Sequence, residues 1–153
     1  MIQKEIRAAI EGFINLLENG LNDEQANIHA LELNLDNLAL AYHFAEVVFE
    51  DYDSEASSPD YNQLKHLAIS RFPGFGYYNE PKNITEKIGE ADILIGDALD
   101  DIADITRDLY EVLWYWENES EKVALWKFCF GYEHHWGAHL RSLQSYLYAV
   151  LYK

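Results

Sequence analysis

The chain has 153 residues, 49% of them hydrophobic and 14% aromatic, so it can bury a core without disulfides or metal staples. Its 27 acidic and 11 basic residues give a net charge of −16. Nucleic-acid binding depends on Lys and Arg that neutralise phosphates, and an anionic membrane repels a negative protein. The composition therefore argues against both kinds of partner.

The sequence also predicts a reducing compartment. Cys129 is the single cysteine, which excludes an internal disulfide and fits the cytosol. Residues 1–9 lack the apolar stretch of a secretory signal, and no apolar run approaches the ~18–20 residues of a membrane span. We expect a soluble cytoplasmic protein.

Two helices are predicted in residues 1–50. The first is indicated by apolar residues at helical spacing, Ile2, Ile6, Ile10, Phe13 and Leu17, and Gly20 is a plausible end signal. Asn22 and Gln25 resemble a capping box that opens a second helix, which continues to about Glu50. Because leucines alternate with period two at 31, 33 and 35, we expect a break near Asn34 or Asp36.

Two segments without helical character come next. Residues 51–60 contain four acids and no base, which is typical of a solvated loop, and Ser58–Pro59 predicts the start of a short helix. That helix is expected to stop at Phe72–Pro73. Residues 72–81 are rich in Gly, Pro and aromatic residues and are predicted to be a loop. Its aromatic side chains either pack onto the bundle or line a ligand site.

Helical patterning resumes at Asn83 and runs to about Glu117, weakened at Gly89 and Gly96. Residues 118–120 form a turn, and Ser120 is a good N-cap for a last helix that reaches nearly to the C-terminus. No convincing β-hairpin is visible. The prediction is a single all-α domain, residues 1–153, with five or six bundled helices and a long C-terminal antiparallel helical hairpin.

A row of aspartates lies on the first helix of this predicted hairpin: Asp97, Asp100, Asp101, Asp104 and Asp108. When residues are placed at steps of about 100°, most of these acids face away from the apolar stripe. Asp101 and Asp108 lie nearest the edge of the stripe. Most of the row is therefore expected to be solvated.

Two histidines on the last helix face inward. His139 falls inside its apolar stripe and His135 on the border, while His134 and Arg141 point to the opposite side. His135 and His139 are four residues apart, the spacing at which two imidazoles on a helix can bind one metal ion.

The register of the helical hairpin brings these groups together. With the turn centred on Glu119, Asp101 is level with Gly137, and Asp104 with His134. Asp101, Asp104, His135 and His139 are thus candidate ligands for one divalent ion, with Arg141 as an anion contact or ion-pair partner. The alternative is a structural network of buried histidines paired with aspartates. The Glu-x-x-His pattern of four-helix di-metal proteins is absent.

Three segments carry a resemblance to a known family: RFPGFGYYNEP (71–81), GDALDDIADITRDLYEVLWYWEN (96–118) and ALWKFCFGYEHHWGAHLRSLQSYL (124–147). They resemble the bacterial family called domain of unknown function 5063, mainly over residues 60–150. The resemblance implies a helical domain without an agreed activity. It also draws attention to the same residues, Asp101, Asp104, His135, His139 and Arg141.

Three functions remain open. Residues 1–64 hold 13 acids and two bases, a balance of −11, which favours a non-enzymatic inhibitor or immunity-type protein that binds a basic protein partner. This hypothesis needs no cofactor. The second is a metal-dependent helical-bundle hydrolase, for instance of a phosphorylated small molecule, that uses the Asp/His cluster. The third is a structural subunit of a homo-oligomer.

Overall fold

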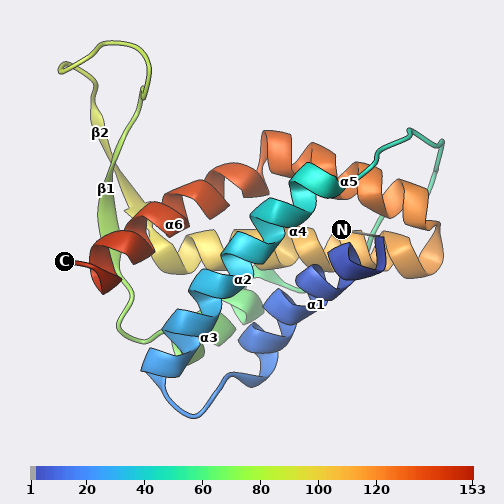
Figure 1. Ribbon diagram of the computed structural model, residues 1–153, viewed down its shortest axis with the longest axis horizontal. Helices are drawn as coiled ribbons and strands as arrows, with labels where there is room; N and C mark the ends of the chain where they lie inside the picture. The colour runs from blue at the N-terminus through green and yellow to red at the C-terminus, as the bar shows by residue number, and fades with distance from the viewer. Residues whose placement is uncertain (1–2) are drawn as a thin grey trace.

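A computed structural model describes residues 3–153, and six helices and two strands lie within that range (Figure 1). In chain order they are α1 (Gln3–Asn19), α2 (Glu24–Phe44), α3 (Tyr61–Arg71), β1 (Tyr77–Pro81), β2 (Ile93–Asp97), α4 (Ala98–Asn118), α5 (Glu121–His134) and α6 (Trp136–Leu151). Helix α4 packs against α1, α3, α5 and α6 and is the centre of the bundle. None of the helices in the described range has the length and apolar character needed to cross a membrane.

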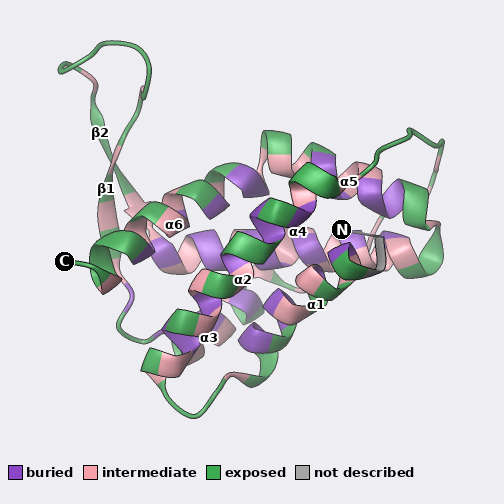
Figure 2. Ribbon diagram, viewed as in Figure 1, coloured by how far each residue is buried: buried purple, intermediate pink, exposed green. Residues whose placement is uncertain are grey.

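The core fills the space between the helices, where the buried residues gather (Figure 2). Its largest fully buried side chains include Trp136, Phe128 and Phe72. At about 25 cal/mol per Å² of apolar surface, burial of such rings contributes strongly to the stability of the bundle. The small sheet stands outside this core.

Helix α1 confirms the first predicted helix, although the predictions for Met1 and Ile2 lie outside the described residues. Helix α2 begins after Asp23, whose carboxylate accepts a hydrogen bond from Ala26 N at 2.8 Å. The expected break near Asn34 or Asp36 is wrong, because α2 is continuous, and it ends at Phe44 rather than near Glu50. The leucines at 31 and 35 are buried one turn apart, while Leu33 is 61% exposed. One exposed leucine produced the misleading alternation.

Residues 45–60 have no regular secondary structure, which confirms the acidic loop and extends it toward the N-terminus. Helix α3 starts two residues later than Ser58–Pro59 predicted, because Asp60 is the N-cap and accepts from Asn62 N. It ends at Arg71, with Phe72 as its C-cap, as expected from the proline at 73.

The two strands correct the purely all-α prediction. β1 and β2 pair antiparallel from Tyr77↔Asp97 to Pro81↔Ile93, within residues expected to be loop and helix (Figure 1). Ile84 and Ile88 lie at helical spacing, but they are 75% and 79% exposed and have no core to pack against. The run Ile93–Leu94–Ile95 has strand character, and Gly89 adopts a φ of +77°, which favours a turn. The resulting hairpin projects from the bundle.

The C-terminal region also differs from the prediction of one last helix. Ser120 caps α5 as expected, but the helix ends at His134 and α6 begins at Trp136. His135, with φ −148° and ψ −80°, forms the corner between the two helices. The predicted long partner of α4 is therefore divided into two shorter helices, α5 and α6, and both pack against α4.

Close packing at the corner explains why a glycine comes after Trp136. A Cβ atom on Gly137 would lie 2.1 Å from the carbonyl oxygen of Tyr132. The Trp136 ring is fully buried below the corner, and its Nε1 donates to Phe128 O at 3.1 Å. The corner turns the chain so that His135 and His139 both lie beside α4.

Candidate metal site

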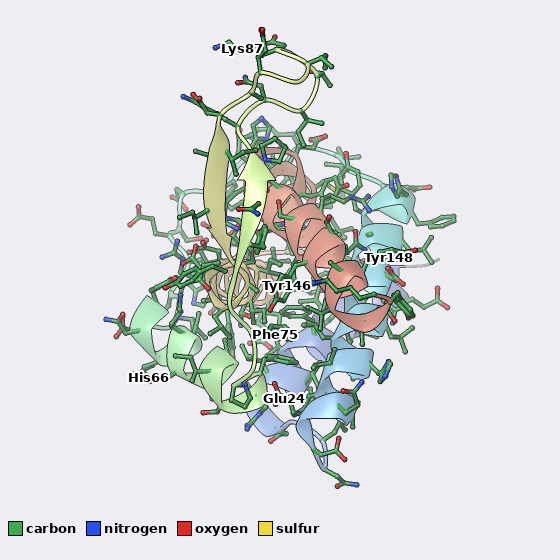
Figure 3. The ribbon with its side chains drawn as sticks, turned by 90° about the vertical axis from the view of Figure 1, so that its left-hand side faces the viewer. Glu24, His66, Phe75, Lys87, Tyr146 and Tyr148 are labelled. Carbon is green, nitrogen blue, oxygen red and sulfur yellow. The ribbon has the colours of Figure 1, made fainter. Side chains whose placement is uncertain are left out.

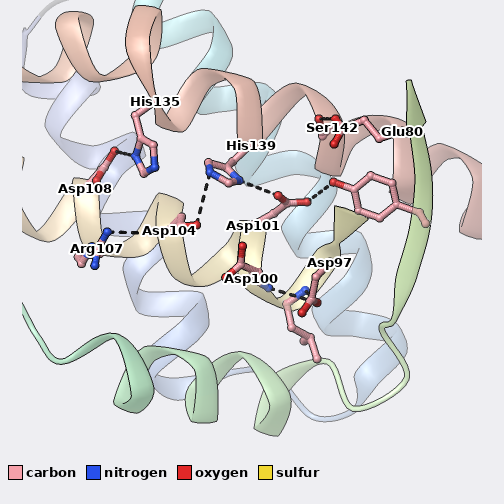
Figure 4. A network of polar contacts seen from close by, with 12 residues as sticks. Glu80, Asp97, Asp100, Asp101, Asp104, Arg107, Asp108, His135, His139 and Ser142 are labelled. Atoms are coloured by element: carbon pink, nitrogen blue, oxygen red, sulfur yellow. Dashed lines mark hydrogen bonds and ion pairs between the residues drawn. The ribbon is translucent and has the colours of Figure 1, made fainter. Parts of the chain in front are cut away.

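The acidic face of α4 begins with a helix cap. Asp97 accepts hydrogen bonds from Leu99 N at 3.0 Å and Asp100 N at 3.4 Å. Its other carboxylate oxygen pairs with Lys65 Nζ at 2.7 Å, so this first aspartate is structural. The next acids along the same face, Asp101, Asp104 and Asp108, lie toward α5 and α6 (Figure 4).

Two of these acids each hold one histidine. His139 Nδ1 lies 2.7 Å from Asp101 Oδ1, and His135 Nδ1 lies 2.6 Å from Asp108 Oδ2 (Figure 4). An ionised carboxylate accepts but does not donate, so each Nδ1 carries the shared hydrogen. In both rings, Nε2 is then the nitrogen that remains available as a ligand. This carboxylate–histidine arrangement is the usual support of a metal-binding imidazole.

Asp104 lies between the two pairs. Its Oδ2 is 3.4 Å from His139 Nε2, and the His135 and His139 ring centroids are 5.0 Å apart. Ligand atoms of Asp104, His135 and His139 all lie within 4.8 Å of one another. With metal–ligand bonds of about 2.1 Å, tetrahedral ligands are about 3.4 Å apart. The aspartate and His139 already satisfy this spacing, and His135 has to move inward.

The site is reachable from solvent. The side chains of Asp104, His139 and His135 are 14%, 25% and 43% exposed, whereas that of Asp101 is 7% exposed. The three candidate ligands thus border water, and a carboxylate that supports one of them is buried. Two hollows flank the pair of histidines.

One hollow, of about 280 Å³, is lined by residues that include Tyr78, Asp101, His139 and Ser142. The other, of about 260 Å³, is lined by residues that include Asp108, Lys127, His134 and His135. Both are large enough for several water molecules or a small ligand.

Carboxylates outnumber cations around the histidines. Arg107 Nη2 approaches Asp104 at 3.6 Å, and Tyr61 donates a hydrogen bond to Asp100. Burial, and next the charge of Asp104, raise the pKa of the Asp100 carboxyl. The hydrogen bond to Asp101 raises the pKa of His139 against the opposing effect of burial. Both shifts make the cluster less negative, and the proton that His139 gains competes with a metal ion for its ring nitrogen.

The four predicted ligands are brought together, but in a different register. His139 reaches Asp101 from a position two residues beyond Gly137, the residue expected to be level with that aspartate. Arg141 is not part of the cluster. Its guanidinium donates to Tyr132 Oη at 2.8 and 3.1 Å and to Gln144 Oε1 at 3.1 Å.

Two residues of the site were not among the four predicted ligands. Asp108 stood out only for its place at the edge of the apolar stripe, seven residues after Asp101 on the same face. Tyr78 donates to Asp101 Oδ2 at 2.5 Å, and burial together with this hydrogen bond raises its pKa. The aromatic segment at 72–81 drew attention to a possible ligand-lining role, but that contact depends on a hairpin that was not expected.

Comparison with known proteins places the chain in a family. No curated protein matches it. The crystal structure of protein BF1032 from Bacteroides fragilis is similar, with a TM-score of 0.77 and 16% identity, over 98% of this chain and 92% of that one. At this identity the likeness concerns the fold alone. The family model described as "Domain of unknown function (DUF5063)" matches residues 3–153, essentially the whole chain. The chain therefore belongs to the family of the domain of unknown function 5063.

Proposed function

We propose that this protein binds one divalent transition-metal ion through Asp104 and the Nε2 atoms of His135 and His139, and uses it for hydrolysis. One observation carries the proposal: two imidazoles, each held at Nδ1 by its own aspartate, offer ligand atoms within 4.8 Å of a third carboxylate. A structural network needs the Asp–His pairs. It does not need both imidazoles to lie beside the same third carboxylate.

The number of ligands favours catalysis over a structural ion. Structural zinc sites are closed by four protein ligands, whereas catalytic sites use three and leave a position for water. An ion in such a site lowers the pKa of bound water to about 7 and supplies hydroxide as the nucleophile. Each flanking hollow is lined by one of the two histidines, so a substrate bound in either hollow would lie near the ion.

The structure favours a narrower class of substrates than the sequence alone suggested. A phosphorylated substrate would rely on Arg141, whose guanidinium is engaged with Tyr132 and Gln144. The surroundings of the histidines are acidic, apart from Arg107 and Lys127. A neutral or cationic ester or amide fits this environment better than a phosphate ester.

Metal analysis tests the proposal. Protein purified without a His-tag is titrated with Zn²⁺, Mn²⁺ and Co²⁺, with retained metal, melting temperature and hydrolysis of p-nitrophenyl acetate as readouts. We expect about one ion per chain, a higher melting temperature, and metal-dependent hydrolysis that is lost in H135Q/H139Q. Absence of both bound metal and a thermal shift would overturn the proposal. Binding without hydrolysis would restrict it to metal binding.

The acidic loop supports protein binding as a second candidate function. From Asp51 to Ala56 exposure alternates, so that Asp51, Asp53 and Glu55 face solvent while the residues between them are half-buried. Tyr52 packs edge-on against Tyr115 with centroids 5.2 Å apart, and Glu50 accepts from Ser120 Oγ at 2.9 Å. The loop thus offers three exposed acids to which a basic protein partner could bind.

A pull-down from a lysate of the source cells tests this second candidate. A basic partner retained at low salt, released by salt, and lost when the three acids become Asn or Gln would support it. Equal recovery by the wild type and this triple variant would count against it.

A further inference from the structure

Two side chains of β1 reach the neighbourhood of the candidate metal site: Glu80 accepts a hydrogen bond from Ser142, and Tyr78 contacts Asp101. Tyr78 on β1 lies opposite Gly96 on β2. A Cβ atom on Gly96 would lie 2.3 and 2.4 Å from two ring atoms of Tyr78 and 2.7 Å from its hydroxyl oxygen. The ring therefore occupies the space that a side chain on β2 would need, and it crosses the sheet toward α4. The ring of Tyr146 on α6, with its centroid 5.4 Å away, packs beside it.

The Tyr78 hydroxyl binds the same carboxylate that holds His139. It donates to Asp101 Oδ2 at 2.5 Å, and the other oxygen of the same carboxylate accepts from His139 Nδ1 at 2.7 Å. The Asp101 side chain is only 7% exposed, so water has little access to replace either partner. Loss of the hydroxyl would leave a buried carboxylate oxygen without this donor and free the carboxylate to rotate.

We propose that Tyr78 is a positioning residue for the metal site: through Asp101 it holds His139 in the tautomer and orientation that present Nε2 to the ion. This inference rests on the proposed metal site. Outer partners of metal-bound histidines typically contribute ~10–100-fold to metal affinity. Tyr78 is one hydrogen bond further from the ion than Asp101, so its effect on metal affinity should lie at the lower end of that range.

The same contact links the ion to the hairpin. Two hydrogen bonds fix the base of the hairpin to the bundle. Gly74 N donates to Glu24 Oε1 at 2.8 Å, and Gly76 N donates to Tyr146 Oη at 3.0 Å. Figure 3 shows Phe75 close to Tyr146 at this base and Lys87 at the far end of the hairpin. If Tyr78 docking strengthens metal binding, metal binding must strengthen docking by the same factor. The ion is then expected to protect the β1–β2 hydrogen bonds from exchange.

Matched phenol deletions test the inference. Y78F removes the hydroxyl that donates to Asp101, and Y110F removes a hydroxyl that donates to Glu18, a carboxylate outside both the cluster and the hairpin. Zn²⁺ affinity is measured by competition with a chromophoric chelator, beside the melting temperature of each metal-free protein. We expect Y78F to bind Zn²⁺ about 10-fold more weakly and Y110F to stay within about two-fold of the wild type.

Two further measurements separate positioning from general stability. G96A, which forces the Tyr78 ring aside, should weaken Zn²⁺ binding at least as much as Y78F. Hydrogen exchange should show that Zn²⁺ protects residues 77–81 and 93–97 in the wild type and less so in Y78F. If the wild type binds Zn²⁺ and Y78F binds it equally tightly, the inference is overturned and the proposed function is left intact. Wild-type protein that binds no metal would overturn both.

Discussion

His135 Nδ1 lies 2.6 Å from Asp108 Oδ2, and this pair joins the corner between α5 and α6 to the middle of α4. His139 and Asp101 form the second such pair one turn into α6, with 2.7 Å between the atoms. The two contacts orient neighbouring imidazoles toward the same carboxylate, that of Asp104. The corner at His135 therefore both changes the direction of the helix and completes the cluster.

Neighbouring histidines provide a direct test of the ligand set. H135Q should reduce Zn²⁺ affinity by more than the ~10–100-fold expected for an outer partner, because it removes a ligand atom. H134Q is the matched control, since His134 is exposed and its Nδ1 contacts Phe130 O at 2.9 Å. Isothermal titration measures both, and equal losses in the two variants would contradict the assignment.

The supporting aspartates should have unequal effects. D101N and D108N each remove a charged acceptor from an imidazole, and we expect a ~10–100-fold weaker Zn²⁺ complex in each case. The larger loss is expected for D101N, because the Asp101 side chain is 7% exposed and that of Asp108 is 19% exposed, so water can replace the second contact more easily. A larger loss in D108N, measured by the same titration, would show that burial is not the deciding factor.

The cysteine should make the protein less stable at high pH. Burial, together with the smaller effect of the Glu133 charge, raises the pKa of the Cys129 thiol to about 11 from its ordinary value of 9.0. Between these values the unfolded chain loses the proton while the folded chain keeps it, so stability falls as pH rises from 9 to 11. Urea unfolding at pH 8, 9 and 10 measures the decline.

Tyrosines with raised pKa values act in the same direction, so C129A serves as the control for the thiol. Its stability should decline less steeply over the same range than that of the wild type. Parallel declines in the two proteins would assign the effect to the tyrosines alone.

Gly137 should resist substitution. In G137A the new methyl group would meet the Tyr132 carbonyl at 2.1 Å, which forces the α5–α6 corner to open. Overpacking of this kind costs about 1–3 kcal/mol of the free energy of unfolding. Gly76, where an added Cβ meets nothing within 4 Å, supplies the control G76A. Urea unfolding that shows equal stability for the two variants would contradict the close approach.

Local signals predicted the helices well and the chain reversals poorly. Apolar spacing and caps such as Ser120 identified α1, α3 and the start of α5, because these depend on neighbours along the chain. The hairpin was missed because Ile84 and Ile88 have a helical period without any partner to pack against. Tertiary packing, which has no local signature, decided the outcome there.

The proximity of Asp101, Asp104, His135 and His139 also followed from local signals. Asp101 and Asp104 share a helix face, and residues near a turn must pack against those on its other side. The break at His135 was not predictable from spacing, because Gly131, Gly137 and Trp136 make the corner through contacts between two helices. Arg141 was included because the family resemblance and the expected register both pointed to it, but in the structure its guanidinium donates to Tyr132.

The overlap of the Tyr78 ring with the space above Gly96 has a consequence for the family as a whole. A relative with a side chain at the position of Gly96 cannot keep an aromatic ring at the position of Tyr78 in this orientation. The two positions should therefore change together during evolution. Relatives that lost the tyrosine should be free to accept larger residues on β2. Covariation between them would record, in sequences alone, which members of the family still connect the hairpin to the histidines.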